Sequence, residues 1–134
     1  MVNFRKAKIG DAKFLLDMQK EEGDDFYVLK DHKDSIKDKD TIFIVAEDNG
    51  EIAGYILGCI NLVKRNEVSL QETRVLMKHR RKGLGKQLNK EFFKECKRRK
   101  VNLIFTTIDK EHIPFYVKSL GFKISKDLAV LKEL

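Results

Sequence analysis

Two β-rich runs joined by an Asn-Gly turn constrain the fold of this chain more than any other feature. The runs are TIFIVAE (residues 41–47) and EIAGYILGCINLV (51–63), with DNG (48–50) between them. Asn-Gly between apolar runs favours a tight hairpin, because both residues tolerate the positive φ angles that such a turn requires. A third run, VSLQETRVLM (68–77), follows the basic turn KRN (64–66). We therefore expect three strands in an antiparallel meander.

The segments around this meander carry helical patterns and one more strand pattern. Residues 2–9 favour a first strand, and the next segment favours a helix with Asp11 as its N-cap. Residues 23–40 are expected to form a short helix and a loop. Apolar residues at helical spacing predict a further helix from residue 83 to about residue 100.

The C-terminal third predicts a parallel strand, a helix and a closing hairpin. LIFTTI (103–108) is a short apolar run of the kind buried on both faces, and it follows a helix, which favours pairing parallel to residues 68–77. Residues 113–120 are expected to form a helix that ends at Gly121. Residues 122–125 and 128–131 are expected to pair. The element order predicts an α+β (mixed α/β) fold with helices on both faces of a central, mostly antiparallel sheet.

Composition bounds the function without choosing it. With 134 residues and 42% hydrophobic content, the chain is expected to form a single domain over residues 1–134. The net charge of +7 favours an anionic partner, which a nucleic acid, a phosphorylated cofactor or an acidic peptide would satisfy equally. Isolated cysteines and scattered histidines argue against a metal site or a disulfide. Without a signal peptide or a long apolar run, we expect a cytoplasmic protein with no membrane partner.

The segment RRKGLGK (80–86) carries the clearest chemical signal. It joins a strand end to a helix start, where unpaired backbone N–H groups and the helix dipole attract anions. Gly83 and Gly85 lack Cβ, so a diphosphate can approach the backbone closely. Neither a P-loop nor a Rossmann fingerprint is present, so another diphosphate ligand is required. On local chemistry alone, an ordinary solvated loop is an equally good interpretation.

These residues resemble the GNAT family of N-acetyltransferases. RRKGLG (80–85) is similar to the family motif [Q/R]-x-x-G-x-[G/A], whose loop holds the pyrophosphate of coenzyme A. Residues 75–80 occupy the family's V-x-P-x-[YF]-R stretch, with departures at Met77 and His79. IPFYVKSLGF (113–122) resembles the family's A-x-x-F-Y-x-x-x-G-F helix, and the N-terminal segment resembles its opening strand and helix.

The resemblance implies transfer of an acetyl group from acetyl-CoA, without a metal, to a primary amine by direct attack in a ternary complex. It implies that the pantetheine arm lies where the strand of residues 68–77 splays from the next strand. Backbone groups of Thr73, Arg74 and Val75 would bind that arm. Asp109 stands where the family usually has a cofactor-binding asparagine, and an ionised aspartate accepts hydrogen bonds but cannot donate them. The implied pyrophosphate site comprises Arg80, Arg81, Lys82, Gly83, Leu84, Gly85 and Lys86.

Two residues are implied as catalytic. Tyr116 matches the family tyrosine that protonates the departing thiolate, although a Phe-Tyr pair on an amphipathic helix is otherwise an ordinary packing feature. The acceptor amine must also lose a proton, which calls for a base. Glu67 and Glu72 are the acids on or beside the splayed strand, and we predict Glu72 as the base, with a cross-strand surface role as the alternative.

The acceptor and the partners are less constrained. Residues 23–40 and the C-terminal hairpin are expected to shape the acceptor pocket, and the aspartates of the first segment would suit a cationic amine, either a small molecule or part of a peptide or protein. Whether the chain acts alone or as a homodimer stays open. The rival interpretation is a non-catalytic basic module that uses the same fold to contact nucleic acid or protein, although no stacking platform or helix-turn-helix signature supports nucleic acid.

Overall fold

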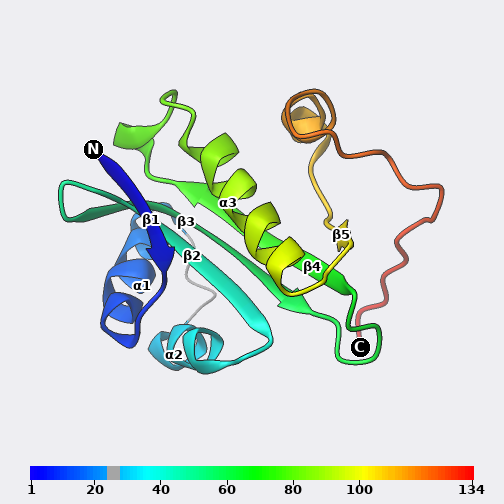
Figure 1. Cartoon of the computed structure of the whole chain (residues 1–134), viewed down its shortest axis with the longest axis horizontal. Helices are drawn as coiled ribbons and strands as arrows, with labels where there is room; N and C mark the ends of the chain where they lie inside the picture. The colour runs from blue at the N-terminus through cyan, green and yellow to red at the C-terminus, as the bar shows by residue number, and fades with distance from the viewer. Residues whose placement is uncertain (24–27) are drawn as a thin grey trace.

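A single five-stranded sheet with the order β1-β2-β3-β4-β5 forms the centre of the computed structural model, which describes residues 1–23 and 28–134 (Figure 1). The first four strands are antiparallel neighbours, and β5 pairs parallel to β4. The mostly antiparallel sheet with one parallel pair was predicted and is confirmed. The strands are β1 (Val2–Lys6), β2 (Thr41–Asp48), β3 (Glu51–Ile60), β4 (Glu67–Val75) and β5 (Leu103–Phe105).

Helices cover both faces of the sheet, as predicted. The structure has three α-helices, α1 (Ala12–Glu21), α2 (Leu29–Lys37) and α3 (Leu84–Arg98), within its described residues. Short helical turns connect the larger elements: the 3-10 helices η1 (Ile9–Asp11), η2 (Met77–His79) and η3 (Lys110–His112) and the π-helix η4 (Pro114–Ser119). None of the helices that the structure describes is long and apolar enough to cross a bilayer.

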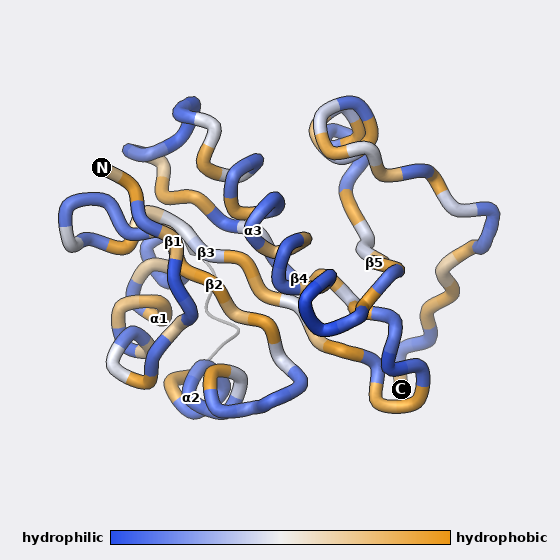
Figure 2. Tube along the Cα trace, in the orientation of Figure 1, coloured by the Kyte–Doolittle hydropathy of each residue, from blue (hydrophilic) through white to orange (hydrophobic). Residues whose placement is uncertain are grey.

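The two faces hold separate apolar clusters. Successive side chains of a strand point to opposite faces, so the nearly continuous apolar runs of β2 and β3 supply both clusters. Leu88 and Phe92 of α3 pack with Ile56 on one face, while Leu15 of α1 packs with Tyr55 on the other. Figure 2 shows hydrophobic segments along the central strands and mainly hydrophilic segments in the surrounding loops.

The β2–β3 turn and the start of α1 follow local sequence signals. Asn49 and Gly50 have φ angles of 52° and 80°, as the predicted hairpin requires. The first helix begins directly after Asp11, as expected. The Asp11 carboxylate does not cap α1 but accepts the backbone N–H of Lys8 at 2.7 Å and pairs with Arg5 at 2.8 Å. Asp11 therefore ties η1 to β1 instead.

A β-bulge in β4 changes which side chains face each helix layer. Leu57 of β3 pairs with Glu72 and Gly58 pairs with Leu70, so Gln71 is an extra residue. Before the bulge, Leu70 packs into the α3 cluster. After it, Arg74 lies opposite Tyr55, whose side chain belongs to the α1 and α2 cluster, so the even-numbered residues have changed faces.

Two predictions for the C-terminal third are wrong. The strand that was expected over residues 103–108 has only three residues, and Leu103 and Phe105 are 43% and 46% exposed, so it is not buried on both faces. Residues 122–125 and 128–131 form no hairpin, and Leu128 and Val130 lie exposed, so the apolar residues of this segment gain no burial that would stabilise a strand pair. The helix that ends at Gly121, with a φ angle of 79°, is present but is a π-helix.

Gly58 offers a test of how closely α3 packs on the sheet. A Cβ atom at this position would lie 2.6 Å from Cζ of Phe92 and 2.9 Å from the carbonyl oxygen of Ser69. We expect Gly58→Ala to lower the free energy of unfolding by about 1–3 kcal/mol, because overpacked cores must shift. Gly10→Ala is the control, since a Cβ there meets nothing within 4 Å. Urea denaturation compares the two variants, and equal stability would contradict the packing described here.

Candidate active site

A large cleft lies between β4 and β5. The two strands pair only as far as Ser69 and Phe105, and the last contact is the Thr106 hydroxyl, which donates to the Leu70 carbonyl at 3.0 Å. Beyond this point the strands diverge around a cavity of about 1110 Å³. The predicted splay is therefore present, and it leaves the edge of β4 facing the cavity.

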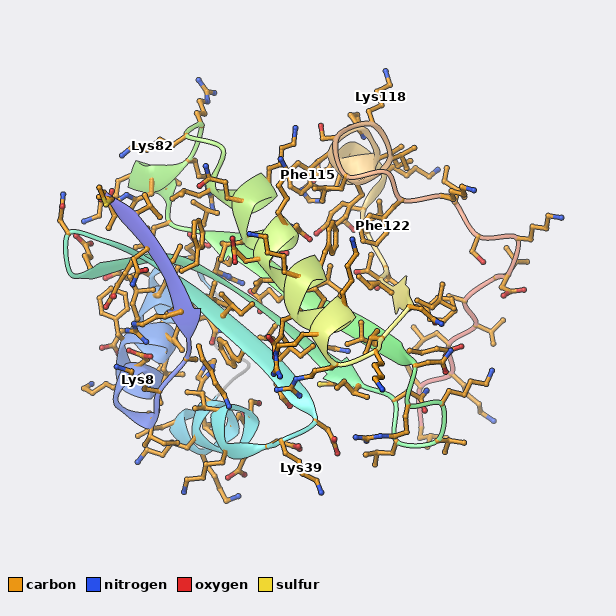
Figure 3. All side chains as sticks on the ribbon, in the orientation of Figure 1. Lys8, Lys39, Lys82, Phe115, Lys118 and Phe122 are labelled. Atoms are coloured by element: carbon orange, nitrogen blue, oxygen red, sulfur yellow. The ribbon has the colours of Figure 1, made fainter. Side chains whose placement is uncertain are left out.

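Most of the predicted site residues line this cavity. They comprise Glu72, Thr73, Arg74, Val75, Arg80, Arg81, Gly83, Leu84, Gly85, Lys86, Asp109 and Tyr116. Lys82 was predicted with them but does not line the cavity, and it lies at the outer edge of the loop before α3 (Figure 3). The positive φ angles of its neighbours, 65° at Arg81 and 75° at Gly83, turn the backbone at this point.

The loop before α3 is built to receive an anion. Gly83 is the N-cap of α3 in the left-handed conformation, and a Cβ there would meet nothing within 4 Å. The first N–H groups of the helix have no intrahelical acceptor, so they and the helix dipole favour a negative group at this open space. Arg81 and Lys86 are exposed beside it, without an ion pair to any described residue.

Arg80 holds the loop in place. Its Nε donates to the Val75 carbonyl at 2.8 Å, and its guanidinium pairs at 3.1 Å with Glu22, the C-cap residue of α1. Arg80 therefore ties the loop to β4 and to α1. Glu22 also lines the cavity, and no motif in the sequence identified it, because its partners are 52 and 58 residues away along the chain.

Tyr116 lies on η4, which packs near the start of α3. A Cβ at Gly85 would lie 3.5 Å from Cζ of Phe115, so this ring covers the first turn of the helix. Phe115 and Phe122 lie between α3 and η4 in Figure 3 and flank Tyr116 edge-on, with ring centroids 5.1 Å and 5.4 Å away. The Tyr116 ring is thus held by packing, while its hydroxyl has no hydrogen-bond partner among the described residues.

Glu72 accepts a hydrogen bond from Tyr55, which no sequence motif indicated. Its Oε2 accepts hydrogen bonds from the Tyr55 hydroxyl at 2.7 Å and from Nε of Arg74 at 2.6 Å. Arg74 also pairs with Glu22 at 2.9 Å. Burial raises the pKa of Tyr55, so its hydroxyl stays a hydrogen-bond donor over the physiological pH range. Burial opposes the charge of Arg74, but the hydrogen bond and the charge of Glu72 outweigh it and hold the pKa of Arg74 above its usual value.

The far rim of the cleft carries Asp109. Its carbonyl accepts the backbone N–H of His112 at 2.9 Å, and both residues line the cavity. The ligand atoms of Asp109, Glu111 and His112 lie within 4.8 Å of one another, a proximity that the scattered histidines of the sequence did not suggest. All three side chains are exposed, and exposed acidic groups commonly gather in this way without a metal ion.

The acidic segment of residues 23–40 contributes little to the cavity as described. Asp24 and Asp25 lie outside the described residues. The other aspartates of the segment are absent from the lining and have partners of their own: the backbone N–H groups of Val28 and Asp40 and the side chains of Lys30 and Arg65. The argument for a cationic acceptor therefore finds no support in the described part of this segment.

Comparisons with known proteins agree with the fold and the loop. The model of the acetyltransferase (GNAT) family matches residues 12–122. No curated protein matches the sequence. A structure of a transcriptional regulator from Bacillus halodurans is 23% identical, with a TM-score of 0.81, and the match covers 99% of this chain and 100% of that one.

Two further solved structures contain coenzyme A groups. A predicted acetyltransferase from Clostridium acetobutylicum, solved with acetyl-CoA, is 17% identical with a TM-score of 0.79, over 98% of this chain and 96% of that one. AAC(6')-Iy in complex with the bisubstrate analogue CoA-S-monomethyl-acetylneamine is 15% identical with a TM-score of 0.83, over 100% of this chain and 99% of that one. The family model spans both the loop before α3 and η4. The chain therefore belongs to the acetyltransferase (GNAT) family, and acetyl-CoA is its co-substrate.

Proposed function

We propose that this protein is an N-acetyltransferase that transfers the acetyl group to a primary amine by direct attack in a ternary complex. The observation that carries the proposal is that one cavity holds the anion-binding start of α3, the hydroxyl of Tyr116 and the carboxylate of Glu72. These are the three groups that the reaction requires: a diphosphate site, an acid for the leaving thiolate and a base for the amine.

Each residue has a defined task in this scheme. Gly83 and Gly85 admit the diphosphate to the backbone N–H groups at the start of α3, and Arg81 and Lys86 add charge. The open edge of β4 at Thr73 to Val75 binds the pantetheine arm in the splay. Asp109, an acceptor when ionised, faces the cavity from the opposite rim.

The proton balance assigns opposite roles to Glu72 and Tyr116. Glu72 takes a proton from the acceptor nitrogen as that nitrogen bonds to the acetyl carbonyl carbon. The carbon–sulfur bond then breaks, and Tyr116 gives its hydroxyl proton to the departing thiolate. The tyrosinate then regains a proton from solvent, and Glu72 releases to solvent the proton that it took, so both groups return to their starting states. Each catalytic cycle releases an N-acetylated amine and free coenzyme A.

The acceptor class is an amine, either on a small molecule or on a peptide or protein. The bisubstrate analogue bound to AAC(6')-Iy joins coenzyme A to an acetylneamine unit. The structural match with AAC(6')-Iy covers 100% of this chain. A screen of amines and peptides with acetyl-CoA, read as free thiol, identifies the acceptor of this protein.

A second candidate function is a non-catalytic module that contacts nucleic acid or protein. The fold similarity to the Bacillus halodurans transcriptional regulator and the net charge of +7 favour it. The two candidates differ in their response to acetyl-CoA. An acetyltransferase releases free thiol from acetyl-CoA when its acceptor amine is present, whereas a non-catalytic module releases none.

Gly83→Val tests the diphosphate site. Acetyl-CoA at about 100 times its dissociation constant should stabilise the wild type by about 2.7 kcal/mol, and we expect no stabilisation of Gly83→Val, because its side chain fills the space above the helix start. Gly50→Val is the matched control, since Gly50 has a similar φ angle of 80°, equally open surroundings and no contact with the cavity. Thermal denaturation with and without acetyl-CoA measures the stabilisation of each variant. Both valines strain a backbone with a positive φ angle, so a stabilisation that is lost only in Gly83→Val reports lost binding. Normal binding by Gly83→Val would rule out the site.

Tyr116→Phe tests the general acid. The ring and its edge-on contacts remain, so affinity for acetyl-CoA should be unchanged, while turnover should fall by ~10² or more for a lost proton-transfer group. Steady-state kinetics with the acceptor found in the screen measures both quantities. Phe122→Leu is the control for disturbed packing, because it alters the ring beside Tyr116 and leaves the hydroxyl. Full turnover in Tyr116→Phe would mean that water protonates the thiolate.

Glu72→Gln tests the base. The amide retains an oxygen for Tyr55 and Arg74 but cannot take a proton, so the alkaline plateau of kcat/KM should fall by ~10². Glu67→Gln is the matched control, because Glu67 is also a glutamate of β4 but lies where β4 pairs with β5, outside the cavity. A pH series that gives equal plateaus for the wild type and Glu72→Gln would assign Glu72 a structural role.

A further inference from the structure

A chain of buried polar side chains runs behind Glu72. The Tyr55 hydroxyl, 2.7 Å from Oε2 of Glu72, accepts from Nε2 of Gln19 at 2.7 Å. Oε1 of Gln19 lies 2.7 Å from Nε2 of His32. Tyr55, Gln19 and His32 are 0%, 1% and 4% exposed, so the chain leads from the helical layer through the core to the cleft. It joins α2, α1, β3 and β4, and no motif in the sequence pointed to it.

The direction of every hydrogen bond in this chain follows from the charge of Glu72. An ionised carboxylate only accepts, so the Tyr55 hydroxyl must donate to it. The Tyr55 oxygen then accepts from the amide nitrogen of Gln19, which turns the Gln19 oxygen toward His32. Nε2 of His32 therefore carries a hydrogen. The buried groups are satisfied in only this one orientation while Glu72 is ionised.

Packing alone does not require the Tyr55 hydroxyl. The ring lies 5.7 Å from the Phe43 ring and belongs to an apolar cluster, where a phenylalanine would fill the same space. Burying a hydroxyl or an amide group costs free energy unless the group is hydrogen-bonded. Even a hydrogen-bonded group contributes little net stability. The group at the end of this chain that reaches the cleft is the Glu72 carboxylate.

The two donors to Glu72 converge on one of its oxygens. Tyr55 and Arg74 both donate to Oε2, whereas Oε1 has no partner among the residues that the structure describes. Two donors from separate strands fix the carboxylate plane more tightly than one donor would. Oε1 is consequently the oxygen that is available to take a proton in the cavity that Glu72 lines.

We infer that Tyr55 is a positioning residue for the reaction: it holds Oε2 of Glu72 so that Oε1 takes the proton of the acceptor amine. The inference rests on the proposed function, in which Glu72 is the base. The amine nitrogen loses one proton, and Oε1 gains it. Both hydrogen bonds to Oε2 persist, and no proton passes along the chain to His32.

A double-mutant cycle tests this role. Tyr55→Phe should lower kcat about tenfold, as the loss of one hydrogen bond to a charged group implies, and leave KM for acetyl-CoA unchanged. In the Glu72→Gln background, the same substitution should lower kcat no further, because the group on which Tyr55 acts is gone. Phe43→Leu is the control for disturbed packing beside the same ring, and it should lower kcat equally little in both backgrounds.

The outcomes separate failure of the inference from failure of the proposed function. If Glu72→Gln leaves kcat/KM unchanged, Glu72 is not the base, so that part of the proposed mechanism and the positioning role both fall, while acetyl transfer itself stands. If no acceptor is acetylated at all, the proposed function falls. If Glu72→Gln lowers kcat/KM and Tyr55→Phe lowers kcat by the same factor in both backgrounds, Tyr55 acts through the fold and only the positioning role falls. Unchanged kcat in Tyr55→Phe also overturns that role.

A second variant applies if the unpaired Gln19 amide prevents Tyr55→Phe from folding. Incorporation of 3-fluorotyrosine at position 55 keeps the hydroxyl and makes it a stronger donor to Oε2. Of the ionisable groups in the described chain, Tyr55 of β3 and Arg74 of β4 contact Glu72, and Glu22 at the C-cap of α1 pairs with Arg74. The stronger donor should change kcat in the wild-type background and leave it unchanged in the Glu72→Gln background, because it acts only through the Glu72 carboxylate. A kcat that does not change, or that changes by the same factor in both backgrounds, overturns the role.

Discussion

The extra residue in β4, Gln71, is the constraint on which the candidate site depends. The side chains of a strand alternate between faces, so one inserted residue exchanges the faces of all that follow. Leu70 packs under α3, and without the bulge Glu72 and Arg74 would point into the same apolar layer. With it, they face Tyr55 and α1, where hydrogen-bond donors and a counter-charge satisfy them. The pairing of β4 with β5 also ends at Ser69, just before the bulge, so the cleft opens where the carboxylate emerges.

A network of alternating charges joins the parts of this site. Arg80 and Arg74 both pair with Glu22, and Arg74 pairs in turn with Glu72. Exposed ion pairs contribute little individually, but the members of this network apart from Arg80 are largely buried, with side chains 17% to 19% exposed. The network connects the loop before α3, the edge of β4 and the end of α1. It therefore fixes the position of the loop before α3 relative to β4.

The net charge of the chain is a poor guide to the site, because some of the basic residues there are paired with acidic ones. Of the basic residues that line the cavity, Arg74 and Arg80 are neutralised by glutamates of the chain itself, whereas Arg81 and Lys86 have no acidic partner in the described structure. Arg81 and Lys86 lie beside the open space at Gly83, at the N-terminal end of α3. The proposed attraction for a diphosphate thus rests on a helix start and two side chains rather than on the overall charge of +7.

The sequence by itself determined the features that rest on neighbouring residues. Asn49-Gly50 specified the hairpin, because turn geometry needs few residues. The glycine-containing turn before α3 and the Phe-Tyr pair of η4 were likewise local signals, and they are the basis on which the cofactor loop and the role of Tyr116 are proposed. The tertiary structure decided the rest. Pairing between distant segments decided the bulge at Gln71, the partners of Glu72 and the missing C-terminal hairpin. Local sequence patterns do not specify the register in which strands pair. Only the folded sheet therefore shows which donor hydrogen-bonds to which carboxylate.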